Sequence, residues 1–199
     1  MDFVNIKTKW NDRYRAATSE PQASRVLKEN LHLLPDQGRA LDLACGLGAN
    51  ALLLAAQGLE VEAWDIADVP VSALQDIALK RQLSIQAELR DVETHPPEPE
   101  TFDVIVASYF LDRNIIPAMI DALKPGGLIY YQTFTRQRVS DRGPRRAEFR
   151  LADQELLHLF SGLQLVFYRE EARIGDVHKG VTDEAMFIGR KKGVRGTRE

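Results

Sequence analysis

The chain has 199 residues, of which 44% are hydrophobic and 28% charged, and its formal net charge is -3 at pH 7. These values are typical of a folded globular domain, so they exclude a disordered or fibrous chain, and the negative charge argues against general nucleic-acid binding. The longest apolar runs, at 51–56 and 104–108, are far shorter than the roughly 20 residues of a membrane-spanning helix.

Two features of the sequence bear on location and organisation. Residues 1–5 lack the basic and apolar pattern of a secretion signal, and the single cysteine, Cys45, excludes an internal disulfide framework. We therefore expect a cytoplasmic protein. No linker or internal repeat divides the chain, so we expect one domain over 1–199, with a helical or lid segment at 1–35 and a disordered tail at 191–199.

After a polar segment that contains scattered aromatic residues, helices alternate with strands along the chain. Apolar spacing, capping residues and glycines predict helices at 24–33, 49–57, 69–83, 117–123 and from about residue 153. Short apolar runs predict strands at 40–44, 60–64, 84–89, 102–107, 128–134, 163–169 and 184–190. This alternation predicts a doubly wound α/β sheet with right-handed crossovers, and a closing hairpin of the last two strands adds one antiparallel strand.

A turn of small residues joins the first predicted strand to a helix. Ala44, Gly46 and Gly48 present little or no side chain, and glycine tolerates positive φ, so a ligand can approach the backbone closely. A dinucleotide fold would place a third glycine where Ala51 stands, and Asp42 would repel a pyrophosphate while suiting a cationic ligand. The turn therefore indicates a nucleotide that carries a positive charge.

Polar residues stand at the ends of four successive predicted strands, where ligands bind in doubly wound sheets. Asp65 comes 17 residues after Gly48, a spacing that lets a carboxylate at the tip of the second strand accept both hydroxyls of an adenosine ribose. A single Asp at a strand end commonly caps a turn or helix, but four polar strand ends together argue against that explanation. These strand ends carry Asp42, Asp65, Asp91, and Ser108 with Tyr109.

The segments at 41–48, 90–92, 102–105 and 123–127, together with Asp65, resemble the ordered motifs of class I S-adenosylmethionine-dependent methyltransferases. The resemblance covers about residues 38–135. It implies a Rossmann-like, seven-stranded, mostly parallel sheet with an antiparallel closing strand and helices on both faces, and S-adenosylmethionine as the cofactor. The family usually has glycine at the position of Ala44. The implied cofactor residues are Asp42, Ala44, Gly46 and Gly48 at the methionine part, Asp65 at the ribose, Asp91 and Val92 at the adenine, and Asn50, Ile66 and Ser108 beside them.

Within that class, the segments at 10–14 and 46–50 and the absence of an inserted domain are similar to the small tellurite-resistance-type methyltransferases. This resemblance implies that Trp10 and Tyr14 belong to a lid over the cofactor, with Arg13 near the cofactor carboxylate. The alternative is a helix whose aromatic face simply packs on the core.

The methyl acceptor should bind beyond the fourth and fifth strands. We name Tyr109 as a candidate catalytic residue because it follows the fourth strand. Between residues 136 and 150 there are six arginines and two acidic residues, and guanidinium groups match oxyanions well. Arg142, Arg145 and Arg146 are therefore candidates for binding an anionic substrate, and Arg145 and Arg146 join Tyr109 as candidate catalytic residues. The alternative is an ordinary solvated loop.

The sequence favours a methyltransferase that acts by in-line transfer on a small acceptor, which is anionic or contains a chalcogen. Holding the acceptor against the methyl group and excluding water can supply most of that catalysis, and the four histidines lack the spacing of a metal site. Two alternatives stay open: an NAD-type oxidoreductase, and a noncatalytic regulatory module that binds S-adenosylmethionine. We expect no metal, nucleic-acid or membrane partner, and the sequence leaves the oligomeric state open.

Overall fold

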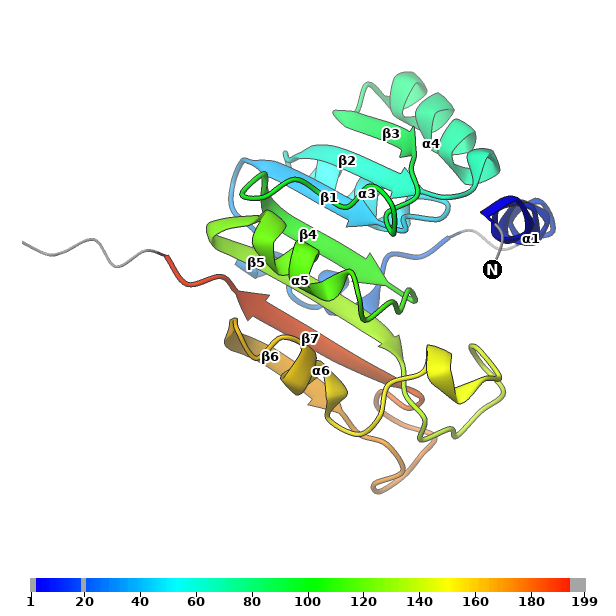
Figure 1. The fold of residues 1–199 in the computed structure, drawn as a ribbon, viewed down its shortest axis with the longest axis vertical. Helices are drawn as coiled ribbons and strands as arrows, with labels where there is room; N and C mark the ends of the chain where they lie inside the picture. Colours follow the sequence, from blue (N-terminus) through cyan, green and yellow to red (C-terminus); the bar gives the residue numbers. More distant parts are fainter. Residues whose placement is uncertain (1–2, 19–20, 194–199) are drawn as a thin grey trace, which may run out of the picture.

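A seven-stranded sheet organises the chain, in the order β3-β2-β1-β4-β5-β7-β6 (Figure 1). The computed structural model describes residues 3–18 and 21–193. The strands are β1 (Arg39–Leu43), β2 (Glu60–Asp65), β3 (Ile85–Leu89), β4 (Phe102–Ser108), β5 (Leu123–Phe134), β6 (Gln164–Glu170) and β7 (Glu184–Arg190). The expected seven-stranded α/β sheet is confirmed.

The direction of each strand also agrees with the prediction. β1 pairs in parallel with β2 and β4, β2 with β3, and β4 with β5. β7 lies between β5 and β6 and is antiparallel to both. Because β7 runs the opposite way, its first residues lie at the same edge of the sheet as the last residues of β5, where Phe134 pairs with Glu184.

Helices cover both faces of the sheet, so two apolar clusters form. Met119 and Leu156, from the helices after β4 and β5, pack in one cluster with Trp64 and Phe102. Leu27, Leu54 and Leu74 pack in the other cluster with Tyr130 of β5. The helices are α1 (Phe3–Arg15), α2 (Arg25–Lys28), α3 (Ala49–Ala56), α4 (Asp68–Arg81), α5 (Ile116–Ala122) and α6 (Glu155–Leu159).

Two predicted boundaries are wrong. The helix expected at 24–33 is divided into α2 and a short 3₁₀ turn at Leu31–Leu33, because the Asn30 side chain donates a hydrogen bond to the Val26 carbonyl at 2.9 Å and competes with the helix. The fifth strand begins at Leu123, not at residue 128, because Leu123 already pairs with Phe102 before a register shift.

The ends of the parallel strands meet two segments that come from distant parts of the chain. Figure 1 shows α1 and the segment that follows β5 beyond the same edge of the sheet, at the right of the view. Of the predicted tail, residues 194–199 lie outside the described residues. No helix in the described ranges has the length and apolar character needed to cross a membrane.

Candidate functional site

The turn after β1 places three residues in the left-handed region of backbone conformation. The φ values are +56° at Ala44, +53° at Gly46 and +76° at Gly48. A Cβ atom at Gly48 would lie 2.5 Å from Leu74, so this glycine lets α4 pack against the turn. A Cβ at Gly46 would instead face the Tyr14 hydroxyl at 3.0 Å, which places Gly46 on the open side of the turn, beneath α1.

Asp65, at the tip of β2, fixes this turn. Its carboxylate accepts hydrogen bonds from the backbone N–H groups of Gly46 at 2.8 Å and of Ala67 at 2.9 Å. Asp65 is 5% exposed, and burial raises the pKa of its carboxyl group above the usual value. A carboxylate has about four acceptor positions, and the Ile66 N–H and the Tyr14 hydroxyl also bond to this one, so a ribose diol can reach it only by displacing Tyr14. Ile66 follows directly, between Asp65 and the Ala67 amide.

Helix α1 covers the open side of the turn. The Tyr14 hydroxyl bonds to the Asp65 carboxylate, and burial raises the Tyr14 pKa. The Trp10 and Tyr14 rings stack with centroids 5.8 Å apart, and the Arg13 guanidinium lies 5.2 Å from the Trp10 ring centroid. The aromatic face of this helix therefore packs on the body of the protein, and it does so directly over the candidate cofactor site.

The side chain of Asn11 fastens α1 to the start of α4. Its oxygen accepts a hydrogen bond from the Val69 N–H at 3.0 Å, and its amide nitrogen donates to the Asp68 carboxylate. The sequence does not single out Asn11, because one polar residue between the aromatic residues of a helix matches no known motif. Asn11 is 6% exposed, whereas the Asp68 side chain that it contacts is exposed.

Asp42, Asn50 and Ser108 form a hydrogen-bonded chain that joins three elements, with Asp42 and Asn50 buried and Ser108 half-buried. Asp42 is fully buried and accepts hydrogen bonds from the Ala51 N–H at 3.0 Å and the Asn50 amide at 3.3 Å. The Asn50 amide also donates to the Ser108 hydroxyl at 3.0 Å, while its oxygen accepts from the Ser24 N–H at 2.8 Å. Burial raises the pKa of Asp42 to about 7. These groups hold the turn against β4, and Asp42 adds a charge that depends on pH.

Asp91 and Val92 lie beyond the neighbouring tip of β3. The Arg90 N–H donates to the Asp65 carbonyl at 2.8 Å, so this segment is joined to the tip of β2. Asp91 is half-buried, and one of its carboxylate oxygens accepts from the Glu93 N–H at 3.0 Å. Val92 is 7% exposed and packs in the core. The structure thus brings the predicted ribose and adenine residues to adjacent strand ends.

On the other side of the turn, Tyr109 belongs to a polar cluster with side chains of β5, β7 and the segment after β5. Its φ is +58°, and its hydroxyl donates to Glu184 at 3.2 Å and accepts from the Gln132 amide at 3.1 Å. Arg142 donates to the other oxygen of Glu184 at 2.6 Å. Burial and the nearby Glu184 carboxylate raise the pKa of Tyr109 to about 12, so the hydroxyl keeps its proton at neutral pH.

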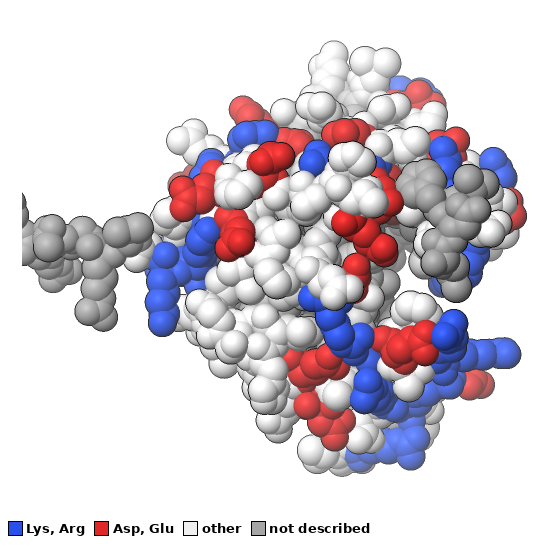
Figure 2. All heavy atoms as spheres, viewed as in Figure 1, with Lys and Arg blue, Asp and Glu red and all other residues white. Residues whose placement is uncertain are grey.

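The arginine-rich segment is folded around a buried member, Arg150. Arg150 is 1% exposed and donates to the carbonyls of Thr135 at 2.8 Å, Pro144 at 2.6 Å and Arg142. Figure 2 shows the positive side chains of this segment gathered at the lower right of the view. The segment therefore has a defined backbone, unlike an ordinary solvated loop.

The three candidate arginines of this segment have different surroundings. Arg142 joins the Tyr109 cluster, whereas Arg145 and Arg146 lie on the exposed part of the segment, and Arg146 pairs with Glu148. Gln132, Glu184 and Arg150 were missed by sequence reasoning. Glu184 could have been noticed in the sequence because it is an acidic residue at the start of an otherwise apolar strand.

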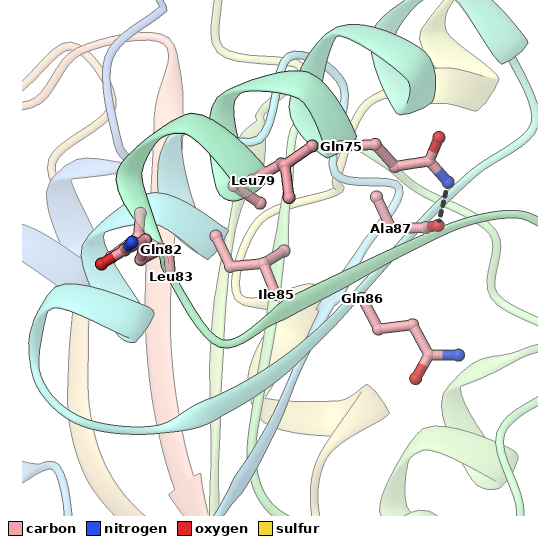
Figure 3. Close-up of a pocket in the computed structure, with 8 residues that line it drawn as sticks. Gln75, Leu79, Gln82, Leu83, Ile85, Gln86 and Ala87 are labelled. Carbon is pink, nitrogen blue, oxygen red and sulfur yellow. Dashed lines mark hydrogen bonds between the residues drawn. The ribbon is translucent and has the colours of Figure 1, made fainter.

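Two cavities lie away from this edge of the sheet. A shallow cavity of about 470 Å³ lies between α4 and β3, where Gln75 donates to the Ala87 carbonyl at 2.9 Å (Figure 3). Apolar and amide side chains line it, including Leu79 and Ile85, and its described lining holds no ionisable residue. The second cavity lies at the opposite edge, beside the 125–128 turn. Neither cavity is lined by the acidic residues or the small-residue turn found at the carboxyl ends of the strands.

The strand order, the small-residue turn after β1 and the acidic tip of β2 define a class I methyltransferase fold. The family model described as tellurite resistance protein TehB matches residues 6–188. The chain belongs to the TehB family.

Relatives of the chain agree with this assignment. A probable S-adenosyl-L-methionine-dependent methyltransferase TehB from Haemophilus influenzae is 30% identical over 155 residues, which cover 73% of this chain and 51% of the relative. The chain thus spans about half the length of that curated relative. The crystal structure of TehB from Haemophilus influenzae aligns with a TM-score of 0.70 at 24% identity, over 92% of this chain and 67% of that one. A SAM-dependent methyltransferase from Methanosarcina mazei aligns with a TM-score of 0.65 at 20% identity, over 87% and 100% of the two chains. These structures share the fold.

Proposed function

We propose that the chain is an S-adenosylmethionine-dependent methyltransferase that acts on a small acceptor. The observation that carries the proposal is the contact between Asp65 and Gly46, which sets a diol-binding carboxylate against a turn that a ligand can approach. Membership of the TehB family and the name of the Haemophilus influenzae relative support it.

The residues at the strand ends fit the proposed cofactor. Asp65 would accept the ribose hydroxyls in place of the Tyr14 hydroxyl, and Asp91 with the Val92 backbone stands where the adenine edge would lie. Ala44, Gly46 and Gly48 leave the backbone accessible at the methionine end, where an ionised Asp42 favours a cation. The walls of the proposed cofactor site are formed by Asn50, Ile66 and Ser108. Its cover is formed by Trp10, Arg13 and Tyr14 of α1. When bound, S-adenosylmethionine supplies a methyl group on a positively charged sulfur.

The chain's own part in catalysis is positioning. In-line transfer needs the acceptor atom held close to the methyl group and opposite the leaving sulfur, with water kept out. Helix α1 closes over the turn and excludes solvent, because Asn11 fastens it to α4 and Tyr14 packs on Gly46. Tyr109 stands next to Ser108, which Asn50 joins to the turn, so the acceptor side and the cofactor side are built on one framework.

The acceptor that fits this edge is small, and it is anionic or contains a chalcogen. The supporting observation is the Tyr109 cluster, in which Arg142 lies beside an aromatic hydroxyl within a positively charged segment. Arg145 and Arg146 would attract the acceptor from the exposed rim. If so, replacing either with alanine raises the acceptor KM; an unchanged KM in both variants removes them from the site.

The test is formation of S-adenosylhomocysteine from S-adenosylmethionine in the presence of selenite, tellurite, a thiol or a small carboxylate. The proposal expects turnover with at least one of these acceptors. Binding of the cofactor without turnover by any acceptor would favour a noncatalytic regulatory module. Binding of NAD in place of S-adenosylmethionine would favour an oxidoreductase.

A further inference from the structure

The start of β7 carries two neighbouring buried acids that the proposed cofactor site does not use. Asp183 is 1% exposed and Glu184 is 5% exposed. Asp183 accepts hydrogen bonds from the N–H groups of Val139 and Ser140 and from the Ser140 hydroxyl, so it holds the backbone of the arginine-rich segment. Glu184 instead binds side chains, and these come from three different elements.

The Glu184 carboxylate is the common partner of the cluster. One oxygen accepts from the Tyr109 hydroxyl at 3.2 Å and from the Gln132 amide at 2.5 Å. The other oxygen accepts from Arg142 at 2.6 Å. Tyr109 and Arg142 also share the ring of Phe134, at 5.1 Å between ring centroids and 5.8 Å from the guanidinium carbon. Two groups that are 33 positions apart in the chain are thereby held beside each other.

Tyr109 and Arg142 keep their positions only if other residues hold them there. Tyr109 has a left-handed backbone, which bulky residues adopt only when their surroundings hold them there. Arg142 has a long side chain that is 59% exposed and would otherwise sample many rotamers. A guanidinium has five N–H donors, and Arg142 uses some of them for Glu184 and the Tyr109 hydroxyl, so other donors stay available. The pair with Glu184 balances the buried negative charge, so an anion approaching Arg142 does not meet an unpaired carboxylate.

We propose that Glu184 is a positioning residue of the acceptor site, which holds the Arg142 guanidinium beside the Tyr109 hydroxyl so that the remaining Arg142 donors bind an oxyanion of the acceptor. That the bound anion is a methyl acceptor rests on the proposed methyltransferase function. That an anion binds at all rests on the cluster of Tyr109, Arg142 and Glu184. It predicts that the acceptor carries a carboxylate or a chalcogen oxyanion. Glu184 acts through Arg142 and does not itself touch the acceptor.

Binding of selenite and of acetate to the full chain, measured by calorimetry without any cofactor, tests the anion site directly. Glu184→Gln keeps the shape of the side chain but removes its charge. It should weaken anion binding tenfold or more, as should Arg142→Gln. The matched control is Glu62→Gln, because Glu62 also pairs with an arginine, Arg39, but at the amino ends of β1 and β2. Glu62→Gln should leave anion binding unchanged. Selenite and acetate distinguish the two kinds of oxyanion.

A double-variant comparison separates positioning from a merely structural role. If Glu184 acts through Arg142, the Glu184→Gln, Arg142→Gln double variant binds the anion no more weakly than Arg142→Gln alone. In turnover, Glu184→Gln should raise the acceptor KM about tenfold while the KM for S-adenosylmethionine changes less than twofold. Thermal unfolding confirms that each variant is folded.

If the wild-type chain binds neither anion, or if the effects of the two substitutions add, the inference about Glu184 is wrong. If the anions bind as expected but S-adenosylmethionine does not, the proposed function fails and the anion site stands. Equal losses in Glu184→Gln and in Glu62→Gln would also overturn the inference, because they would show a general effect of removing an ion pair.

Discussion

Asp65 accepts a hydrogen bond from the Gly46 N–H at 2.8 Å, which joins the tip of β2 to the turn after β1. The contact links residues 19 positions apart and leaves the other side of the carboxylate facing α1, where Tyr14 bonds to it. A ribose diol that uses Asp65 must therefore replace the Tyr14 hydroxyl as its partner. Asp65 therefore supports the turn, and in the proposed function it is also the main point of cofactor contact.

Asp65→Asn should weaken cofactor binding. The amide keeps the size of the side chain but puts an NH₂ donor where one oxygen accepted a hydrogen bond, so either a backbone N–H or a ribose hydroxyl loses its partner. A lost bond to a charged acceptor costs about 1.5–3 kcal/mol, which corresponds to a roughly 10- to 100-fold higher Kd for S-adenosylmethionine in calorimetry. Asp76→Asn, an exposed change on α4, serves as the control and should leave the Kd unchanged.

Cofactor affinity should rise with pH because of Asp42. Burial raises its pKa from 3.8 to about 7, so the group becomes charged in the folded chain only as the pH passes about 7. A cationic ligand is held more tightly by the ionised form, and calorimetry should show a lower Kd at pH 8 than at pH 6. Asp42→Asn should reduce this pH dependence. An unchanged slope in Asp42→Asn would contradict this role.

The same shift has the opposite consequence for stability. A carboxyl group whose pKa is raised by folding contributes stability that is fully present below its unfolded pKa, near 3.8, and is lost as the pH rises through about 7. The free energy of unfolding of wild type relative to Asp42→Asn should therefore fall between pH 4 and pH 7. Denaturant unfolding of both chains at several pH values measures this change. If the wild-type chain instead gains stability relative to Asp42→Asn as the pH rises, the raised pKa of Asp42 is wrong.

Ala44→Gly should stabilise the fold. Ala44 has a φ of +56°, and a side chain in this left-handed region costs roughly 1–2 kcal/mol, which glycine avoids at some cost in chain entropy. We expect a net gain of about 1 kcal/mol in the free energy of unfolding. Ala73→Gly, in the interior of α4, is the opposite control and should cost about 1 kcal/mol. A loss of stability in Ala44→Gly would show that the turn does not hold its backbone as described.

Arg150→Met should destabilise the chain by about 3 kcal/mol or more. The change leaves the carbonyls of Thr135, Pro144 and Arg142 without their donor, and buried groups without partners are costly. Arg145→Met, on the exposed part of the same segment, should change stability by less than about 0.5 kcal/mol. Equal melting temperatures for the two variants would mean that Arg150 does not hold the segment together.

The sheet and the small-residue turn after β1 could be predicted because their signals are local. The β-branched run at 102–107 indicates a strand buried on both faces, and Gly46 and Gly48 mark a turn wherever they occur between a strand and a helix. Asp65 could be placed because parallel strands bring their carboxyl ends to one edge. These inferences need only the order of elements, not the packing of particular side chains.

The acceptor side could not be predicted in the same way. Glu184 is 75 positions from Tyr109, and the two meet because β7 inserts antiparallel between β5 and β6. Arg150 resembles the exposed arginines around it, and its burial depends on carbonyls that are gathered only when the segment folds. The sequence does not distinguish Arg142, Arg145 and Arg146, and the structure separates them by their partners and exposure.

Calorimetric titration of the wild-type chain and of Asp65→Asn, with S-adenosylmethionine and separately with NAD, shows which nucleotide the chain binds and whether Asp65 holds it. We expect the wild-type chain to bind S-adenosylmethionine and not NAD, and Asp65→Asn to raise the Kd for S-adenosylmethionine at least tenfold. Binding of NAD without S-adenosylmethionine, or an equal Kd for the two chains, would contradict this expectation.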